Sequence, residues 1–536
     1  MPEYDVLIIG GGHNGLVCAA YLAKAGLKVR IVERRSIVGG AAVTEEFHPG
    51  FRNSTASYTV SLLNPKVIND LDLYNNGLTV VERDIANFYP HSDQNSEYLK
   101  LFFDLDETKE EFRKFSQHDA STLPAYYDAI ETAADVLRDL VLETPPNAGG
   151  GVSDFWRLLK TGNRFRKMNR VDQKLVMDLF TKSAAEFLSI YFEHTSIKAA
   201  FAFDGIVGAY ASPYTPGTAY VLLHHAFGEV NGAKGRWGHA IGGMGAITQA
   251  MARVAISRGV EITTDAAVRN VLIEDDQAVG LRLESGEEVF ARAIVSNVNP
   301  KLLFEKMVTP TIAPEFTSQM KHYACGSGTF RMNVALSDLP DFSCLPGTST
   351  QEHHRSGIII GPTIEYLEQA YLDARNSGWS KHPIIEILIP STLDDTLAPE
   401  GAHVASLFCQ QFSPTLKDDQ SWDDVREDVA SLIIDTVNFY APNFKESILA
   451  TQIHSPLDLE RKFGLTGGDI FHGRLSLDQM FANRPALGSA DYRLLVKGLY
   501  LCGSGAHPGG GVTGAPGHNA AQEILKDLRK GHILRA

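Results

Sequence analysis

The residues with the clearest chemical meaning lie near the N-terminus, where three spaced glycines precede an acidic residue. The segment DVLIIGGGHNGLVCAAYLAKAGLKVRIVERR places Gly10, Gly12 and Gly15 in a G-x-G-x-x-G pattern and carries Glu33 further on. Glycines with this spacing permit a tight turn, close approach of a pyrophosphate to the backbone, and close packing of a helix on a strand. A helix N-terminus attracts phosphate oxygens, and an acid in this position binds ribose hydroxyls. The pattern therefore predicts a dinucleotide site.

Three elements must position these residues. The apolar run at 5–9 predicts a buried strand, the periodic apolar residues between Leu16 and Leu27 predict a helix, and 28–32 predicts a second strand that ends at Glu33. A glycine-rich turn without a ligand is the alternative interpretation of a lone G-x-G-x-x-G. Here the strands, the glycines, the helix and the acid occur in register, which favours the dinucleotide.

A second glycine pair follows the acid. Arg34 comes directly after Glu33, and Gly39 and Gly40 follow in the stretch ERRSIVGGAAVTEEF. A simple NAD domain would usually continue with another helix at this point. The pair predicts either a loop that folds over the pyrophosphate or an ordinary Gly-Gly turn, and both interpretations stay open.

The middle of the chain predicts a second contribution to the same domain. Glycines 242, 243 and 245 open a helical pattern, and short β-like runs follow, with the hairpin signal ESGE at 284–287. The expected runs cover 260–264, 268–274, 278–284, 288–290 and 293–296. No apolar strand directly precedes these glycines and their spacing is not G-x-G-x-x-G, so we expect no separate NAD(P) domain.

The C-terminal run GLYLCGSGAHPGGGVTGAPGHNAA predicts one more strand at 499–502, a glycine turn, and a helix that starts near 513–516. Glycines let the backbone lie flat against a planar ligand, and a helix N-terminus stabilises negative charge that develops on it. We therefore expect this run to form the floor beneath a flavin ring.

Together the segments 5–58, 237–297 and 499–528 resemble the phytoene desaturase-like branch of the flavin amine oxidase superfamily. The stretches that carry the resemblance are ASYTVSLL, SPYTPGTAYVLLHH, GGMGAI, IPSTLDDTLAPEGAHVASLF, DLERKFGLTGGDIFH and the C-terminal glycine run. The resemblance implies FAD as cofactor and an α/β fold. It implies a Rossmann-type FAD-binding domain assembled from discontinuous segments, with a mixed α+β substrate domain that has a helical part. The expected FAD-binding segments are 1–80, 235–300 and 486–536, and the substrate domain covers 81–234 and 301–485.

The resemblance also implies site residues. Those expected to bind the cofactor are Gly10, Gly12, His13, Asn14, Gly15, Glu33, Arg34, Gly39, Gly40, Ala41, Val268, Gly503, Val512 and Thr513. Val268 would contact adenine through its backbone, and it would also be a buried strand valine. Residues expected near the flavin and the substrate are Ser57, Tyr58, His507 and Pro508. No catalytic acid or base and no metal site are assigned.

These expectations describe an FAD-dependent oxidoreductase of the dehydrogenase or desaturase type. Hydride would pass from a small apolar substrate to flavin N5, and a second, unidentified acceptor would reoxidise the flavin. One alternative is a lipid- or partner-binding protein without redox chemistry, on the scaffold of the Rab GDP-dissociation inhibitors. The glycine pattern and Glu33 count against it. A flavin-dependent isomerase without net redox change is a further alternative.

Composition bounds the remaining choices. With 536 residues the chain should form more than one domain, and its net charge of −15 argues against nucleic acid and against strong attraction to anionic membranes. A peripheral membrane contact through an apolar patch stays open. Five cysteines without C-x-x-C spacing indicate reduced thiols, and no apolar run predicts a transmembrane segment. A strand starting near residue 5 leaves no room for a targeting peptide, so a cytoplasmic location is expected. The resemblance also implies a mitochondrial link, which an animal member of the family has.

The inserted segments give weaker signals. Residues 122–143 predict an amphipathic helix that Thr122 could cap, and 422–439 predict another. The basic cluster 164–170 predicts a solvated helix face more readily than a contact with an anionic lipid or partner. The segment 209–227 could line a substrate channel or pack in the core. The pairs of neighbouring histidines, His224–His225 and His353–His354, are expected to be structural.

Overall fold

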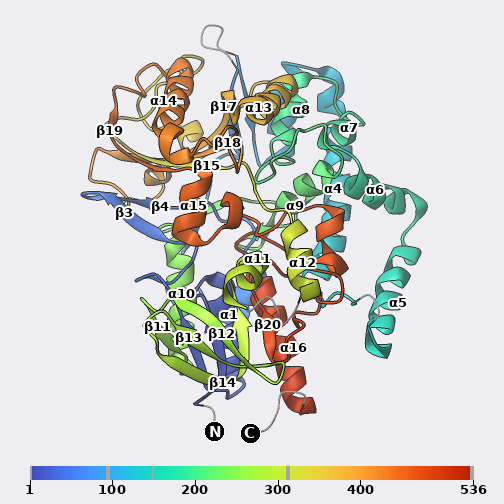
Figure 1. Ribbon diagram of the computed structural model, residues 1–536. Helices are drawn as coiled ribbons and strands as arrows, with labels where there is room; N and C mark the ends of the chain where they lie inside the picture. The colour runs from blue at the N-terminus through green and yellow to red at the C-terminus, as the bar shows by residue number, and fades with distance from the viewer. Residues whose placement is uncertain (1–2, 92–96, 148–149, 309–313, 532–536) are drawn as a thin grey trace.

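The computed structural model describes residues 3–91, 97–147, 150–308 and 314–531, and Figure 1 shows how they are arranged. Both chain ends lie at the lower end of the molecule in this view, beside the first of two large sheets. The second large sheet lies at the upper end, and a group of helices occupies the right-hand side. The fold is a mixed α/β arrangement, as predicted.

The first sheet joins segments from both ends and the middle of the chain. Over the described residues it has seven strands in the order β11-β2-β1-β14-β13-β12, with β20 also pairing with β14. Its parallel strands are β1 (Tyr4–Ile9), β2 (Val29–Val32), β11 (Glu261–Thr263), β14 (Glu288–Ser296) and β20 (Leu499–Leu501). The antiparallel extension consists of β12 (Val268–Glu274) and β13 (Gln277–Leu283).

Three helices pack around this sheet. They are α1 (His13–Lys24), α10 (Met244–Ser257) and α16 (Ala515–Lys530). Their apolar faces and both faces of the short parallel strands form one buried core, which is why these strands read as continuous apolar runs in the sequence. The core therefore brings the first and last helices into direct contact.

The second sheet is mostly antiparallel and has seven strands in the described part of the chain, in the order β19-β15-β18-β17-β16-β6-β7. The strands are β6 (Asn87–Pro90), β7 (Tyr98–Leu101), β15 (Phe330–Leu336), β16 (Gly357–Ile360), β17 (Trp379–Leu388), β18 (His403–Phe412) and β19 (Ile448–His454). The helices α13 (Ile364–Ser377) and α14 (Trp422–Tyr440) pack against it. Short strands and helices connect the two sheets: β3 (Thr44–His48), β4 (Phe51–Ser54), α2 (Pro65–Asp70), β5 (Val80–Glu82), β8 (Glu229–Val230), β9 (Ala233–Lys234), β10 (Gly238–Ala240), α11 (Pro300–Leu302), α12 (Pro314–His322) and α15 (Pro456–Phe463).

A helical region fills the insert between β7 and β8. Its members are α3 (Leu105–Arg113), α4 (Gln117–Val141), α5 (Val152–Lys167), α6 (Arg170–Thr181), α7 (Ala184–Leu188), α8 (Thr195–Ala202) and α9 (Thr218–Ala226). Most of these helices share an apolar core with part of the second sheet. None of the helices in the described ranges is long and apolar enough to cross a membrane.

The structure corrects two local predictions. The helix expected at 122–143 begins earlier, because Ser116 caps α4 by accepting a hydrogen bond from Asp119 N at 3.1 Å. Thr122 lies inside the helix, where its hydroxyl donates to the Tyr191 carbonyl at 2.6 Å, so it cannot be the cap. The runs predicted separately at 288–290 and 293–296 form the single strand β14. The hairpin at ESGE and the helix near 422–439 are confirmed.

Candidate functional site

The turn between β1 and α1 has the compact geometry that the glycine spacing predicts. A Cβ on Gly15 would lie 2.4 Å from the Gly10 carbonyl oxygen, so only glycine allows α1 to approach β1 this closely. Gly12 is the N-cap of α1 and forms a backbone bridge with Gly39. The N–H groups of the first helical turn have no acceptor within the helix, which leaves them available to an anion.

Glu33 is buried at the end of β2 and is fixed by the backbone around it. One carboxylate oxygen accepts from Gly11 N at 2.8 Å, and the other accepts from Arg35 N at 2.9 Å. A carboxylate has about four acceptor positions, so Glu33 keeps capacity for two hydroxyl donors. This is the arrangement expected of a ribose-binding acid.

A cavity of about 320 Å³ lies at the carboxyl ends of the parallel strands β1, β2 and β14. This is the position in which open α/β sheets bind ligands. The predicted residues that line it together are Gly10, Gly12, His13, Asn14, Glu33, Arg34, Gly40, Ala41 and Val268. The structure thus gathers most of the predicted cofactor residues in one place, from segments more than two hundred residues apart.

Other predicted residues support the cavity from behind. Gly39 pairs with Gly12, and a Cβ on Gly503 would lie 2.6 Å from the Asn297 carbonyl oxygen, so the C-terminal run packs tightly on the end of β14. Thr513 is buried just before α16, where its hydroxyl accepts from Ala515 N at 3.1 Å. Their roles are structural in this geometry, and direct contact with a cofactor stays a prediction.

Sequence reasoning missed the uncharged polar residues Asn297, His472 and Ser504 of the cavity, and also the basic residues Arg35 and Lys306. Asn297 Nδ2 donates to the Gly10 carbonyl at 3.2 Å, and Asn14 Nδ2 donates to Ser504 Oγ at 3.2 Å. These bonds tie the glycine turn to the middle and the end of the chain. Asn297 directly follows a parallel strand, a signal that could have identified it.

The polar groups of the cavity suit a dinucleotide. Asn14 Oδ1 and His472 Nδ1 are buried and have no hydrogen-bond partner among the described residues. Burial lowers the pKa of His13 to about 4 and that of His472 to about 3, so both imidazoles are neutral near pH 7. Neutral donors and acceptors beside a free helix N-terminus can form hydrogen bonds with ribose hydroxyls and pyrophosphate oxygens. FAD therefore fits the residues present.

Arg34 supplies positive charge at the edge of the same cavity. Its guanidinium donates to the carbonyl oxygens of Arg461 and Lys462 at 3.1 and 2.7 Å, which fixes the side chain at the C-terminal end of α15. Burial lowers its pKa below the ordinary value, while the charge of Glu33 acts in the opposite direction. The guanidinium stays charged and can attract a phosphate.

A second, smaller cavity of about 90 Å³ lies beside the C-terminal glycine run. The predicted residues Ser57, Tyr58 and Val512 line it. Its other walls are mostly apolar and include Val207, Trp237, Met244, Ile247, Ile470 and Phe471. The segment 209–227 contributes His225 from α9 to this cavity, while most of that helix is buried in the core; its role in a substrate channel stays a prediction.

Tyr58 connects this apolar cavity to a buried charged cluster on the second sheet. Its hydroxyl donates to Glu386 Oε2 at 2.5 Å, and its ring lies beneath the Arg331 guanidinium at 4.7 Å. Arg83 Nη2 lies 4.0 Å from the other Glu386 oxygen. Burial raises the pKa of both Tyr58 and Glu386 and lowers that of Arg331 to about 10. The cavity-lining phenol is therefore linked by a short hydrogen bond to a buried carboxylate.

Asp204, beside this cluster, should make the stability of the protein depend on pH. Burial, and then the charge of Glu386, raise its pKa from 3.8 to about 7. The folded protein therefore holds this proton more tightly than the unfolded chain, so the contribution is complete below pH 3.8 and is lost as the pH rises to about 7.

We expect Asp204→Asn, which cannot titrate, to lose this dependence. The difference in melting temperature between the wild type and this variant should change between about pH 4 and pH 7 in thermal unfolding at a series of pH values. The exposed Asp435, changed to Asn, serves as the matched control and should follow the wild type. Parallel profiles for wild type and Asp204→Asn would contradict the assignment.

The remaining predicted residues lie elsewhere. His507 is buried, has Nε2 at 3.1 Å from the Leu140 carbonyl, and lines a cavity beneath α5 rather than either cavity above. Pro508 lines neither of the two. Their place near the flavin stays a prediction. Arg484, which sequence reasoning also missed, is fully buried and donates to the carbonyl oxygens of Phe471 and Ser504 at 2.7 and 2.8 Å. It joins the segment at Phe471, which lines the smaller cavity, to the segment at Ser504, which lines the larger one.

The cysteines take no part in either cavity, and all five are free thiols. Cys325 is partly buried, and burial raises the pKa of its thiol to about 12. The histidine pairs lie in the core: His224 and His225 on α9, His353 and His354 behind β16. A dithiol reaction has no support in this geometry.

The glycine turn, the acid at the end of β2 and the cavity across the parallel strands define a Rossmann-type dinucleotide-binding protein. Comparison with known families makes the class specific. The chain belongs to the family described as flavin containing amine oxidoreductase, whose sequence pattern matches residues 15–329.

Full-length relatives agree with this assignment. The chain is 40% identical to pyridine nucleotide-disulfide oxidoreductase domain-containing protein 2 of Mus musculus, over 98% of this chain and 94% of the relative. It is 24% identical to a limonene dehydrogenase chain of Castellaniella defragrans, over 98% and 95% of the two chains. It is 23% identical to prolycopene isomerase 1 of an Oncidium hybrid cultivar, over 100% and 86%.

Solved structures show the same fold. An oxidoreductase from Methanosarcina mazei superposes with a TM-score of 0.60 at 15% identity, over 97% of this chain and 100% of that one. Putrescine oxidase bound to putrescine superposes with a TM-score of 0.58 at 15% identity, over 98% and 99%. The protein is an FAD-dependent oxidoreductase, and the cavity at the glycine turn suits the ribose and pyrophosphate of its cofactor.

Proposed function

We propose that the protein oxidises a small apolar substrate as a dehydrogenase or desaturase. The observation that carries the proposal is the cavity at Tyr58, whose walls are mostly aliphatic and aromatic, with few polar side chains among them. Apolar walls with a few convergent polar groups bind a hydrocarbon-like ligand and orient it. FAD, when bound, supplies a hydride acceptor.

Two relatives support this substrate class by the names they carry. Limonene is a cyclic hydrocarbon and prolycopene is a polyene, and the chains of both enzymes match this one over nearly its whole length. Because the identities are only 24% and 23%, they indicate a chemical class and not one substrate. An apolar compound of this kind partitions into membranes, so a peripheral membrane contact is part of the same proposal.

The residues of the chain would bind the substrate, exclude water and hold the released proton. Phe471 and Trp237 would cover the apolar part of the substrate. Tyr58 would accept the proton that leaves the substrate as its own proton passes to Glu386, across the 2.5 Å hydrogen bond. The raised pKa of Glu386 makes this carboxylate a stronger base than an exposed one.

The test is anaerobic mixing of the FAD-loaded protein with cyclic and linear terpenes, followed by visible spectroscopy and product analysis. We expect the flavin bands to bleach and a more unsaturated product to appear. Tyr58→Phe should retain FAD yet react at least about a hundredfold more slowly, because the proton has no acceptor in the cavity. Bleaching by polar amines only, with no reaction of any hydrocarbon, would overturn the proposal.

A flavin-dependent isomerase is the second candidate, and the similarity to prolycopene isomerase favours it. An isomerase would convert a polyene under the same anaerobic conditions without net bleaching of the flavin. Product analysis therefore separates the two candidates. A binding protein without redox chemistry is less well supported, because the tight glycine turn and the buried Glu33 favour a bound dinucleotide.

A further inference from the structure

The helix α5 is unusual because it turns its apolar residues away from the protein. No residue of α5 is buried, although the helix contains phenylalanine, tryptophan and leucine side chains. Val152, Phe155, Trp156 and Leu159 are exposed by 75%, 58%, 65% and 44%. Their spacing places them on one helical face. Figure 1 shows α5 at the edge of the molecule, beyond the other helices of this region.

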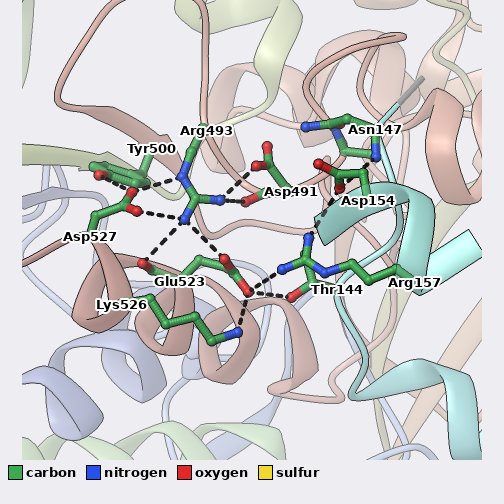
Figure 2. Close-up of polar contacts among 11 residues, drawn as sticks. Thr144, Asn147, Asp154, Arg157, Asp491, Arg493, Tyr500, Glu523, Lys526 and Asp527 are labelled. Atoms are coloured by element: carbon green, nitrogen blue, oxygen red, sulfur yellow. Dashed lines mark hydrogen bonds and ion pairs between the residues drawn. The ribbon is translucent and has the colours of Figure 1, made fainter. Parts of the chain in front are cut away.

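The opposite face of α5 carries polar residues that hold the helix to the body of the protein. Asp154, Arg157, Thr161 and Arg164 follow helical spacing and are the better-covered residues of the helix. Arg157 pairs with Glu523 of α16 at 3.4 Å and with Asp154 at 3.3 Å, as Figure 2 shows.

Further ion pairs continue this attachment along the helix. Glu143 lies just beyond α4 and pairs with Lys160 at 2.9 Å and with Arg164 at 3.0 Å. A surface helix usually buries its apolar face and exposes its polar face, and α5 does the reverse. The ion pairs fix the orientation of α5 and leave its apolar face exposed.

The anchor of α5 is itself well fixed. Glu523 is almost fully buried and also accepts from Thr144 at 2.8 Å and pairs with Arg493 at 2.9 Å. These contacts and those of Asp527 with Arg493 and Tyr500 make one connected network in Figure 2. The outward face of α5 is therefore held in place by α16, the helix that packs against α1 beside the first sheet.

The charge of this region is opposite to that of the whole protein. Residues 151–170 contain six basic residues and one acidic residue, whereas the net charge of the chain is −15. Lys160, Arg166, Lys167 and Arg170 are exposed. Long basic side chains beside an apolar face can reach lipid phosphates while that face enters the bilayer. Two copies of this chain would instead bring two basic faces together.

Apolar space lies directly beneath the helix. Two cavities of about 310 and 320 Å³ lie between α4 and α5, and Leu140 and Thr161 line both. One reaches His507 of the C-terminal run, and the other reaches Leu223 of α9. The neighbouring residue His224 contacts Phe471, which lines the cavity at Tyr58. A lipid-soluble molecule that left a membrane at α5 would meet apolar surface on its way inward.

We propose that α5 docks the protein onto a membrane surface that contains anionic lipid, with Val152, Phe155, Trp156 and Leu159 entering the bilayer. The proposal rests on the proposed function and deepens it, because it gives an apolar substrate a route from the bilayer to the protein. It does not require a transmembrane segment. It also assigns the basic cluster at 164–170 to lipid contact, where the sequence alone favoured a solvated helix face.

The test is sedimentation of the FAD-loaded protein with vesicles of phosphatidylcholine, with and without phosphatidylglycerol. The wild type should sediment with the anionic vesicles, and high salt should weaken the binding. Phe155→Glu, Trp156→Glu and Leu159→Glu together should weaken it by more than about tenfold.

The matched control places glutamates at Ile256, Phe439 and Leu449, which are similarly exposed apolar residues on α10, α14 and β19. It should bind vesicles like the wild type. The flavin spectrum and circular dichroism of each variant check its folding. A second variant, Arg166→Glu with Lys167→Glu, leaves the apolar face intact and should weaken binding to anionic vesicles only.

Equal sedimentation of the wild type and the α5 triple variant would overturn the proposal. So would a lipid-independent dimer that the triple variant abolishes, because a second copy would then cover this face. Vesicle binding needs no turnover. Failure here would leave the proposed oxidation untouched, and failure of the terpene test would leave the docking helix untouched.

Discussion

Replacing Gly12 by valine is expected to remove FAD from the protein while the fold persists. Gly12 has φ of −70°, which valine can adopt, so the backbone does not forbid the change. A Cβ there would lie 2.8 Å from Asn297 Nδ2, and the valine methyl groups would extend into the cavity where the pyrophosphate must approach. Each lost bond between a backbone N–H and a charged phosphate costs about 1.5–3 kcal/mol.

The expected result for Gly12→Val is a fall in FAD content by more than about tenfold, measured as the ratio of flavin to protein absorbance after purification and after titration with FAD. Gly162→Val is the matched control, because a Cβ at Gly162 meets no atom of the described chain within 4 Å. The control should keep its flavin, and circular dichroism should show both variants folded. Full flavin content in Gly12→Val would place the cofactor elsewhere.

The second large effect should come from Glu386→Leu, which removes the carboxylate of the buried charged cluster. Glu386 is 4% exposed and is the carboxylate beside both Arg83 and Arg331. Arg331 is 1% exposed, and two of its nitrogens have no hydrogen-bond partner among the described residues. Leaving buried cations without their counter-charge costs about 3–5 kcal/mol, far more than the side chain of leucine can return.

Urea unfolding of the FAD-loaded protein should therefore show Glu386→Leu to be less stable by about 3–5 kcal/mol. Glu386→Gln keeps an acceptor for Tyr58, so its free energy of unfolding should lie between those of the wild type and Glu386→Leu. Asp435→Ala breaks an exposed pair with Lys445 and should change the free energy of unfolding by less than about 1 kcal/mol. A loss in Glu386→Leu as small as that of Asp435→Ala would show that the arginines do not depend on this carboxylate.

The sequence predicted closely the glycine turn and the acid that line the larger cavity. Gly10, Gly12, Gly15 and Glu33 act through local backbone geometry, and the strand and helix around them follow from apolar periodicity within a few residues. The resemblance extended this to Gly40, Ala41 and Val268, which line the same cavity. The assignment of all described residues to the two predicted domains stays a prediction.

The substrate end of the site was much harder to predict. Tyr58 was expected near the flavin, but nothing in its own segment indicates the contact with Glu386, which lies 328 positions later. Arg331 and Glu386 sit within strands whose neighbours are apolar, so each looks like an isolated polar residue in the sequence. Their pairing depends on which strands are adjacent in the second sheet.

The local sequence and the tertiary structure thus determined different features of the protein. The sequence by itself determined the family, the cofactor and the tight glycine turn before α1, because spacing over a few residues dictates backbone shape and helix direction. Only the tertiary structure decided that Ser116 and not Thr122 caps α4, and that the apolar face of α5 points outward. It also decided that Asn297 and Ser504 tie the glycine turn to the middle and the end of the chain. An amphipathic pattern gives the two faces of a helix but not which face the rest of the protein covers. For α5 that choice was made by Glu143 and Glu523, which pair with Arg157 and Arg164 and so hold the polar face of the helix against the protein.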